Sequence, residues 1–272
     1  MEIPVVEVKS DSIKTRFLSA AILAPIALAL VWLGGWFFVG LILVAGVLMV
    51  GEWDRLCGGS GRGLHVWLLS AAVVAVSVFS ATGQWNLLIP VVVGGILLAS
   101  VANRKNSSKW TALGGLYILL PIVALLWIRS DVQWGLISIV WVLVAVWATD
   151  TGAYFAGKSI GGPKMAPRIS PNKTWAGLIG GVIAAAFVSV LTGKIAGAGT
   201  LQNLALFGGF AAVVGQIGDV CESSVKRHFG VKDSGNIIPG HGGLFDRLDS
   251  LLIVALVIAG LNLAAGKAVL WQ

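Results

Sequence analysis

The sequence is poor in charge, cysteine and histidine. Only 11% of its 272 residues are charged and 57% are hydrophobic, whereas an ordinary soluble domain carries about 25% charged residues. The two cysteines, Cys57 and Cys221, lie far apart without a C-x-x-C pattern, so we expect two free thiols. Three scattered histidines are too few for a histidine-based metal cluster. These scarcities exclude a disulfide framework and indicate a polytopic membrane protein.

Two further patterns are missing or misleading. The sequence has no G-x-S-x-G turn and no cysteine paired with a histidine, so it offers no obvious covalent nucleophile. A net charge of +7 could suggest nucleic acid, but the basic residues stand in short loops between apolar runs. Charge in that position sets membrane topology. We therefore expect no nucleic-acid partner.

Apolar runs long enough to cross a bilayer recur along the chain. A transmembrane helix needs roughly 17–25 apolar residues, so the predicted fold is all-α, with about nine transmembrane helices. No charge falls between Phe17 and Val50, and we expect Gly34 and Gly35 to divide this run into a hairpin. The predicted helices cover residues 17–33, 36–51, 66–81, 85–101, 110–128, 134–155, 174–193, 201–224 and 249–267.

The distribution of basic residues tests this topology. With nine helices, all but Arg129, Lys194 and Lys267 of the nineteen basic residues fall on one side. The positive-inside rule makes that side, and the N-terminus with it, cytoplasmic. We expect a multi-pass membrane protein with most of its charged loops on the cytoplasmic face.

A dense group of charges lies between Gln216 and Ser250, flanked by apolar runs. Charge at a membrane edge is energetically costly and usually functional. Four of its polar residues are spaced to share one face of a helix: Asp219, Glu222, Ser223 and Lys226. Such a face suits a metal-bound phosphate. Alternatively, the helix end neutralises itself, with Lys226 and Arg227 complementing the helix dipole.

A glycine-rich loop from Lys232 to Gly243 follows, and the ninth helix is expected to begin near its end. Backbone N–H groups in such a loop, and at a helix N-terminus, favour anions. Asp246 and Asp249 are three residues apart and share a face. They could satisfy the helix dipole, or bind Mg²⁺, which typically uses one or two carboxylates together with phosphates. If the two helix ends meet, Asp219 and Asp246 would converge on a metal.

A second polar site is predicted earlier in the chain. Asp150 interrupts the apolar sixth helix, and Ser170 and Lys173 lie in the loop that follows. Ser170 and Lys173 could bind phosphate, while Asp150 could pair with a cation or orient a substrate group. The alternative is that Asp150 pairs with a loop lysine and only supports topology.

The segment from Ser223 to Asp249 resembles the pattern of the phosphatidate cytidylyltransferases, also called CDP-diacylglycerol synthases. That pattern reads S-x-V-K-R, four residues, K-D-x-G, then I-P-x-H-G-G-L-x-D-R-L-D, and the segment matches it without departure. The run from Ser170 to Trp175 resembles the family's second motif. Relatives often carry an acidic or amide residue after this tryptophan, where this chain has Ala176, so we assign no role there.

The resemblance implies the reaction CTP + phosphatidate → CDP-diacylglycerol + diphosphate with Mg²⁺, and makes Asp219 and Asp246 the metal ligands. The further catalytic residues that it implies are Lys226, Arg227, Lys232, Asp233, His241, Arg247 and Asp249. The expected substrate-binding residues are Asp150, Ser170, Lys173, Ser223, Gly242 and Gly243. Whether a second cation shares the site stays open. The resemblance also implies a location in the bacterial inner membrane, with the active site on the cytoplasmic face. Residues 1–130 would then form a scaffold of transmembrane helices, and residues 131–272 would carry the catalytic site. Members of the family form dimers, but no feature of this sequence specifies an interface.

Two other classes of function compete with this interpretation. A transporter or channel would spread acidic residues through several helices near mid-membrane, whereas here they cluster at one interface. Another membrane enzyme acting on lipid phosphates, such as a phosphoglycosyl transferase or a polyprenol kinase, would also use a charged interfacial site. The D-G-x-x-A-R pattern of the CDP-alcohol phosphotransferases is absent from the sequence.

Overall fold

The computed structural model describes residues 13–104, 107–240 and 242–272, and within these ranges the chain forms nine α-helices. They are α1 (Ile13–Leu33), α2 (Gly35–Leu56), α3 (Leu64–Ala81), α4 (Leu88–Ala102), α5 (Ser108–Ser130), α6 (Gly135–Ser159), α7 (Trp175–Ala196), α8 (Leu201–His228) and α9 (Phe245–Ala265). Short 3-10 helices, η1 (Trp85–Leu87) and η2 (Val269–Trp271), and two strands, β1 (Lys164–Ala166) and β2 (Ser170–Thr174), complete the described elements.

The helices have the length and composition of membrane spans. Eight of the described helices, counting η1 with α4, are long and apolar enough to cross a bilayer, and the apolar segment Ala21–Leu33 of α1 is shorter. Each predicted apolar run coincides with one of these helices. The chain is therefore a multi-pass, all-α membrane protein, as predicted.

The expected break in the first apolar run is confirmed. Gly34 and Gly35 have φ values of 65° and 49°, and they separate α1 from α2. This left-handed conformation strains any residue with a Cβ atom. Arg129, at the end of α5, donates from Nε to the carbonyl oxygen of Val31 at 3.3 Å, which satisfies a carbonyl at the end of α1.

A short β-hairpin between α6 and α7 was not predicted. β1 pairs antiparallel with β2, with Lys164 opposite Thr174 and Ala166 opposite Ser170. Thr174 is the N-cap of α7, and its Oγ1 accepts a hydrogen bond from Gly177 N at 3.0 Å. The hairpin fixes the position of Lys173, which immediately precedes this cap.

The backbones of α6 and α7 approach one another closely. A Cβ atom on Gly152 would lie 2.6 Å from the carbonyl oxygen of Gly180, and a Cβ atom on Gly180 would lie 2.3 Å from Ala156 Cβ. Small residues at such positions allow membrane helices to pack by backbone contact. α7 packs in turn on α8, and α8 on α9, which contacts α5 of the N-terminal half.

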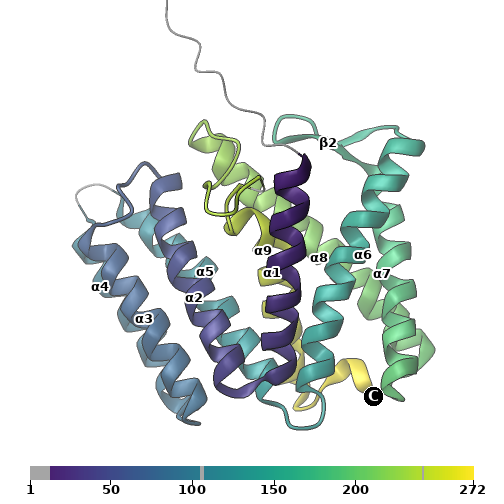
Figure 1. Ribbon diagram of the computed structural model, residues 1–272, viewed down its shortest axis with the longest axis horizontal. Coiled ribbons are helices and arrows are strands. Elements are labelled where there is room, and N and C mark those ends of the chain that lie inside the picture. Colours follow the sequence, from purple (N-terminus) through teal and green to yellow (C-terminus); the bar gives the residue numbers. More distant parts are fainter. Residues whose placement is uncertain (1–12, 105–106, 241) are drawn as a thin grey trace, which may run out of the picture.

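Figure 1 shows the consequence of this packing for the polar segments. The β-hairpin, the loop between α8 and α9 and the start of α1 lie at one end of the helical bundle, and the C-terminus lies at the other. We call the first of these the polar end. The α3–α4 pair and α7 occupy opposite edges, with α9 between them.

Candidate active site

The last turns of α8 and the first turns of α9 pack directly against each other. Ser250 Oγ donates to the carbonyl oxygen of Gly215 at 3.0 Å, and a Cβ atom on Gly218 would lie 3.2 Å from the carbonyl oxygen of Asp249. Near the ends of the two helices, Lys226 Nζ lies 2.7 Å from Asp246 Oδ1. The two acid-bearing helix ends therefore meet, as the prediction of a single site required.

Asp246 closes the loop between these helices. Its Oδ2 accepts hydrogen bonds from Ser234 N at 2.9 Å, Ser234 Oγ at 3.0 Å and Gly243 N at 3.0 Å, while Oδ1 contacts Lys226. A Cβ atom on Gly243 would lie 2.0 Å from Ser234 Oγ, so any larger residue there would displace Ser234. Gly242, with φ 83°, turns the chain into this contact.

Three carboxylates gather beside this closure: Asp219 and Glu222 of α8, and Asp249 of α9. One oxygen from each lies within 4.8 Å of the others, and we call this group the acid cluster. Glu222 is 1% exposed, and within the described residues its Oε1 accepts no hydrogen bond. Three carboxylates, one of which has a buried oxygen that accepts no hydrogen bond, are suitable ligands for a hard cation such as Mg²⁺.

The acid cluster contains two carboxylates that were not predicted as metal ligands, Glu222 and Asp249. Asp219 is in the acid cluster, but Asp246 is engaged with Lys226 and the loop, so its role as a metal ligand stays a prediction. Glu222 was placed on the correct helix face from sequence but was not named as a ligand. It also contacts Lys226, whose Nζ lies 2.5 Å from Glu222 Oε2. Lys226 thus bridges α8 and α9, and it would have to move before Asp246 could bind a metal.

The second predicted polar site joins the first. Lys173 Nζ lies 2.6 Å from Asp219 Oδ2. Asp150, Lys173 and Asp219 line one cavity of about 190 Å³ between α6, α7 and α8. The two groups that were inferred separately from sequence therefore form one centre, with Asp219 shared by the acid cluster and this cavity.

The other predicted residues surround this centre. Ser223 Oγ donates to Asp219 Oδ1 at 3.3 Å. Arg227 donates to the carbonyl oxygens of Ile169 (3.2 Å) and Val231 (2.9 Å), which ties the β-hairpin to the loop after α8. Ser170 lies on β2 opposite Ala166. Lys232, Asp233 and Arg247 are exposed at the polar end, and His241 lies outside the described residues.

Sequence reasoning missed Glu52, at the end of α2. It is 0% exposed, and its Oε1 and Oε2 accept hydrogen bonds from Leu244 N at 2.9 Å and Phe245 N at 2.8 Å. The N-terminus of α9 was predicted to attract an anion, and the anion that it binds here is this side chain. The sequence does contain a signal, because Glu52 is an acidic residue at the end of an apolar run. A hydropathy window uses such a residue only to mark where the run ends.

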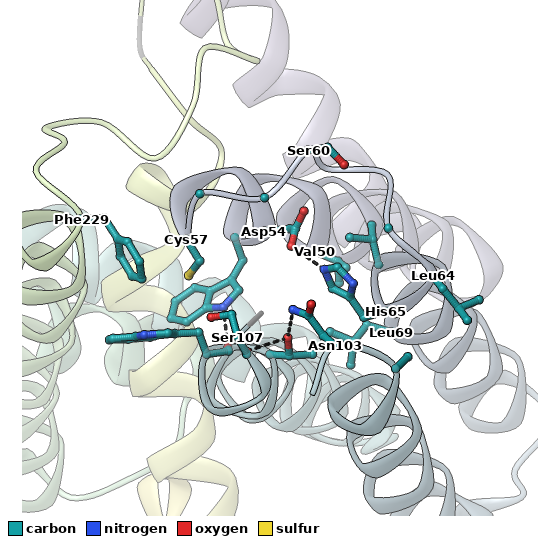
Figure 2. Close-up of a pocket in the computed structure, with 18 residues that line it drawn as sticks. Val50, Asp54, Cys57, Ser60, Leu64, His65, Leu69, Asn103, Ser107 and Phe229 are labelled. Atoms are coloured by element: carbon teal, nitrogen blue, oxygen red, sulfur yellow. Dashed lines mark hydrogen bonds and ion pairs between the residues drawn. The ribbon is translucent and has the colours of Figure 1, made fainter. Parts of the chain in front are cut away.

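Another cavity lies elsewhere at the polar end (Figure 2), with a volume of about 720 Å³ between α2, α3 and α5. In it, Asp54 Oδ1 and His65 Nε2 lie 2.5 Å apart, and its described lining has no lysine or arginine to match a triphosphate. Burial and the neighbouring Asp54 raise the pKa of Cys57 to about 12, which disfavours the reactive thiolate form. Cys57 and Cys221 are both free, as predicted.

Together, the fold and the site define a class: a multi-pass membrane protein with a centre of carboxylates and lysines at one end of its bundle. The model of the cytidylyltransferase family matches residues 14–263. The chain therefore belongs to the cytidylyltransferase family, a family of nucleotidyltransferase enzymes.

Curated relatives carry a more specific name. The phosphatidate cytidylyltransferase of Brucella suis is 36% identical over 253 residues, which are 91% of this chain and 92% of that protein. The protein of the same name from Pseudomonas aeruginosa is 38% identical over 271 residues, covering 93% and 98%. That of Bacillus subtilis is 40% identical over 184 residues, covering 65% and 68%.

Proposed function

We propose that this protein is a phosphatidate cytidylyltransferase, which converts CTP and phosphatidate into CDP-diacylglycerol and diphosphate. The observation that carries the proposal is the junction at Asp219, where the acid cluster meets Lys173 and the cavity between α6 and α8. A centre that binds phosphate needs carboxylates that hold a cation and lysines that bind phosphate oxygens. These carboxylates and lysines must lie next to one another. The relatives that bear this name, at 36% and 38% identity over most of the chain, support the same reaction.

The reaction requires no covalent nucleophile from the protein. An oxygen of the phosphatidate phosphate forms a bond to the α-phosphorus of CTP. The bond from that phosphorus to the oxygen bridging the β-phosphorus breaks, and diphosphate leaves with the electron pair. Catalysis of such a transfer consists mainly of positioning the reactants and stabilising their charge.

Residues of this chain can supply both effects. Lys173 and Lys226 lie within the centre, each already paired with a carboxylate, so they can exchange that partner for a phosphate oxygen. The exposed Lys232 and Arg247 at the polar end can attract CTP from water. Asp219, Glu222 and Asp249 are the proposed Mg²⁺ ligands, with Asp246 as a further ligand if Lys226 turns to phosphate. Bound Mg²⁺ would neutralise phosphate oxygens and stabilise the leaving diphosphate.

The proposed location follows from charge and from chemistry. In the topology expected from the sequence, all but three of the nineteen basic residues fall on one side of the membrane, and Lys173 and Lys226 of the centre are on that side. Such an excess is typical of a cytoplasmic face. We therefore place the centre at the cytoplasmic edge of the bacterial inner membrane. There a membrane lipid can enter laterally, and CTP can enter from the cytoplasm.

The test is an assay with radiolabelled CTP and phosphatidate on the purified protein in detergent. We expect label in CDP-diacylglycerol when Mg²⁺ is present and none when it is chelated. Turnover of CDP-diacylglycerol with no use of CTP would contradict the proposed reaction. Incorporation of label at full rate after chelation would contradict the metal assignment alone.

A further inference from the structure

Glu52 is a buried carboxylate that no lysine or arginine neutralises among the described contacts; instead it contacts backbone amides. Its two oxygens accept hydrogen bonds from Leu244 N and Phe245 N, at 2.9 and 2.8 Å. The first N–H groups of a helix have no partners within the helix, and a carboxylate there is favoured by the helix dipole. Glu52 therefore caps α9 from a different helix, 192 residues away along the chain.

α9 has no cap of its own. Leu244 stands at the N-cap position, where no side chain makes a capping bond. Leucine cannot supply the side-chain oxygen with which serine or aspartate caps a helix. The acceptors for the first N–H groups of α9 therefore come from another helix, through Glu52.

Glu52 also touches the other arm of the same loop. A Cβ atom on Gly235 would lie 2.8 Å from Glu52 Oε1. Beside it, Trp53 packs on Phe245 with ring centroids 5.5 Å apart, and Tyr117 packs on Phe245 at 5.2 Å. Tyr117 OH donates to the carbonyl oxygen of Gly218 at 3.3 Å, next to Asp219. α2 and α5 therefore support both helices of the centre from behind.

We propose that Glu52 is a positioning residue of the catalytic centre. Its carboxylate holds the first turn of α9 and the loop before it, and thereby directs Asp246 toward Lys226 and Asp249 toward Asp219. The N-terminal half of the chain then contributes to the site itself as well as to the membrane scaffold. The inference rests on the proposed function only where turnover is measured.

The main test variant is Glu52→Gln. The amide keeps the size of the side chain, but its NH₂ group donates, so one of the two α9 N–H groups loses its acceptor. We expect kcat to fall about 10- to 100-fold, as is common when a group that orients a metal ligand is removed. The Mg²⁺ concentration for half-maximal activity should rise, while KM for CTP changes less than kcat.

The matched control is Asp54→Asn. Asp54 lies two residues further along the chain and is also buried, 8% exposed against 0% for Glu52. Its partners are Gly61 N (2.7 Å), in the connection to α3, and His65, in the first turn of α3, and neither belongs to α9. Figure 2 shows Asp54 with His65. We expect this variant to lose thermal stability but to keep the wild-type kcat and Mg²⁺ dependence.

A second variant and a second measurement cover the case in which Glu52→Gln does not fold. Gly235→Ala leaves Glu52 in place but pushes a methyl group against its carboxylate, and it should raise the Mg²⁺ requirement in the same direction. The second measurement is the rise in unfolding temperature that Mg²⁺ causes in detergent, which needs no turnover. Glu52→Gln and Gly235→Ala should both need more Mg²⁺ for this rise than the wild type and Asp54→Asn.

Two results would overturn the inference. One is wild-type kcat and Mg²⁺ response in a folded Glu52→Gln variant or, if that variant does not fold, in Gly235→Ala. The other is an equal loss of kcat in Glu52→Gln and Asp54→Asn at equal loss of stability, which would make the effect purely structural. Failure of the wild-type protein to use CTP would refute the proposed function instead, and the Mg²⁺ titration of unfolding would still decide the role of Glu52.

Discussion

Asp246 and Asp249 lie one turn apart on α9, yet their surroundings are opposite. Asp246 accepts hydrogen bonds from Lys226, Ser234 and Gly243. Within the described residues, Asp249 accepts one, from its neighbour Ser250 N at 2.6 Å, and it faces Asp219 and Glu222. The first carboxylate is surrounded by donors, and the second is surrounded by other carboxylates.

This difference separates a structural role from a binding role. The hydrogen bonds that Asp246 accepts stabilise the loop. If Asp246 lost its charge, the buried groups that now donate to it would be left without a full partner, which is energetically costly. Carboxylates gathered around Asp249 repel one another, and such an arrangement becomes favourable when a cation binds. Substitutions at the two positions should therefore affect different quantities: stability at Asp246, and the Mg²⁺ requirement at Asp249.

The largest effect is expected for Asp219→Asn. Asp219 belongs to the acid cluster and also pairs with Lys173, so the variant removes a proposed metal ligand and frees a lysine at once. Turnover of CTP should fall below detection, while the protein still elutes as a folded species in size-exclusion chromatography. The control is Asp131→Asn at the opposite end, where Asp131 accepts from Gln133 N and Trp134 N. Substantial activity in Asp219→Asn would remove Asp219 from the mechanism.

Asp246→Asn should come next. The amide cannot accept from all of the present donors, and we expect the free energy of unfolding to fall by about 2–3 kcal/mol. Activity should fall with it, because the loop that carries Lys232 and Gly242 loosens. A thermal unfolding curve in detergent measures the first effect, and the CTP assay measures the second. An unfolding temperature equal to that of the wild type would contradict the structural role of Asp246.

Asp249→Asn should behave in the opposite way. Loss of one charge from the acid cluster reduces repulsion, so the unfolding temperature without Mg²⁺ should stay the same or rise. The Mg²⁺ concentration for half-maximal activity should increase about tenfold or more, since one proposed ligand is weakened. A Mg²⁺ titration of activity measures this change. A lower unfolding temperature together with an unchanged Mg²⁺ requirement would reverse the roles assigned to Asp246 and Asp249.

The smallest effect is expected for Gly243→Ala, compared with Gly260→Ala on the same helix. A methyl group on Gly243 would meet Ser234 Oγ, whereas nothing lies within 4 Å of a Cβ atom on Gly260. We expect Gly243→Ala to lower the free energy of unfolding by about 1–2 kcal/mol, and Gly260→Ala to leave it unchanged or raise it slightly. Equal unfolding temperatures for the two variants would show that the loop does not need this close contact.

Features that depend on local sequence could be predicted. Hydropathy located the membrane helices, and the absence of charge around Gly34 placed the hairpin there. Helical periodicity placed Asp219, Glu222 and Lys226 on one face, which the contact of Lys226 with Glu222 confirms. Topology also put Lys173 and Asp219 at the same end, where they form an ion pair. Each of these inferences needs only the period of one helix or the side of one loop.

Features that depend on how helices pack side by side could not be predicted. The bond from Leu244 N to Glu52 joins residues 192 positions apart, and hydropathy says nothing about which helices become neighbours. The choice of Asp246 as the partner of Lys226 has the same origin. Spacing puts Asp246 and Asp249 on one face, but only the close approach of α8 and α9 at Gly218 decides which carboxylate meets the lysine.

The most direct test of the account is to locate Mn²⁺, used in place of Mg²⁺, by its anomalous scattering in crystals of the wild-type protein. Both ions prefer oxygen ligands in octahedral geometry. The account predicts a peak in contact with Asp219 and at least one other carboxylate of the acid cluster, Glu222 or Asp249. Mn²⁺ bound without Asp219, or no Mn²⁺ between α8 and α9, would contradict it.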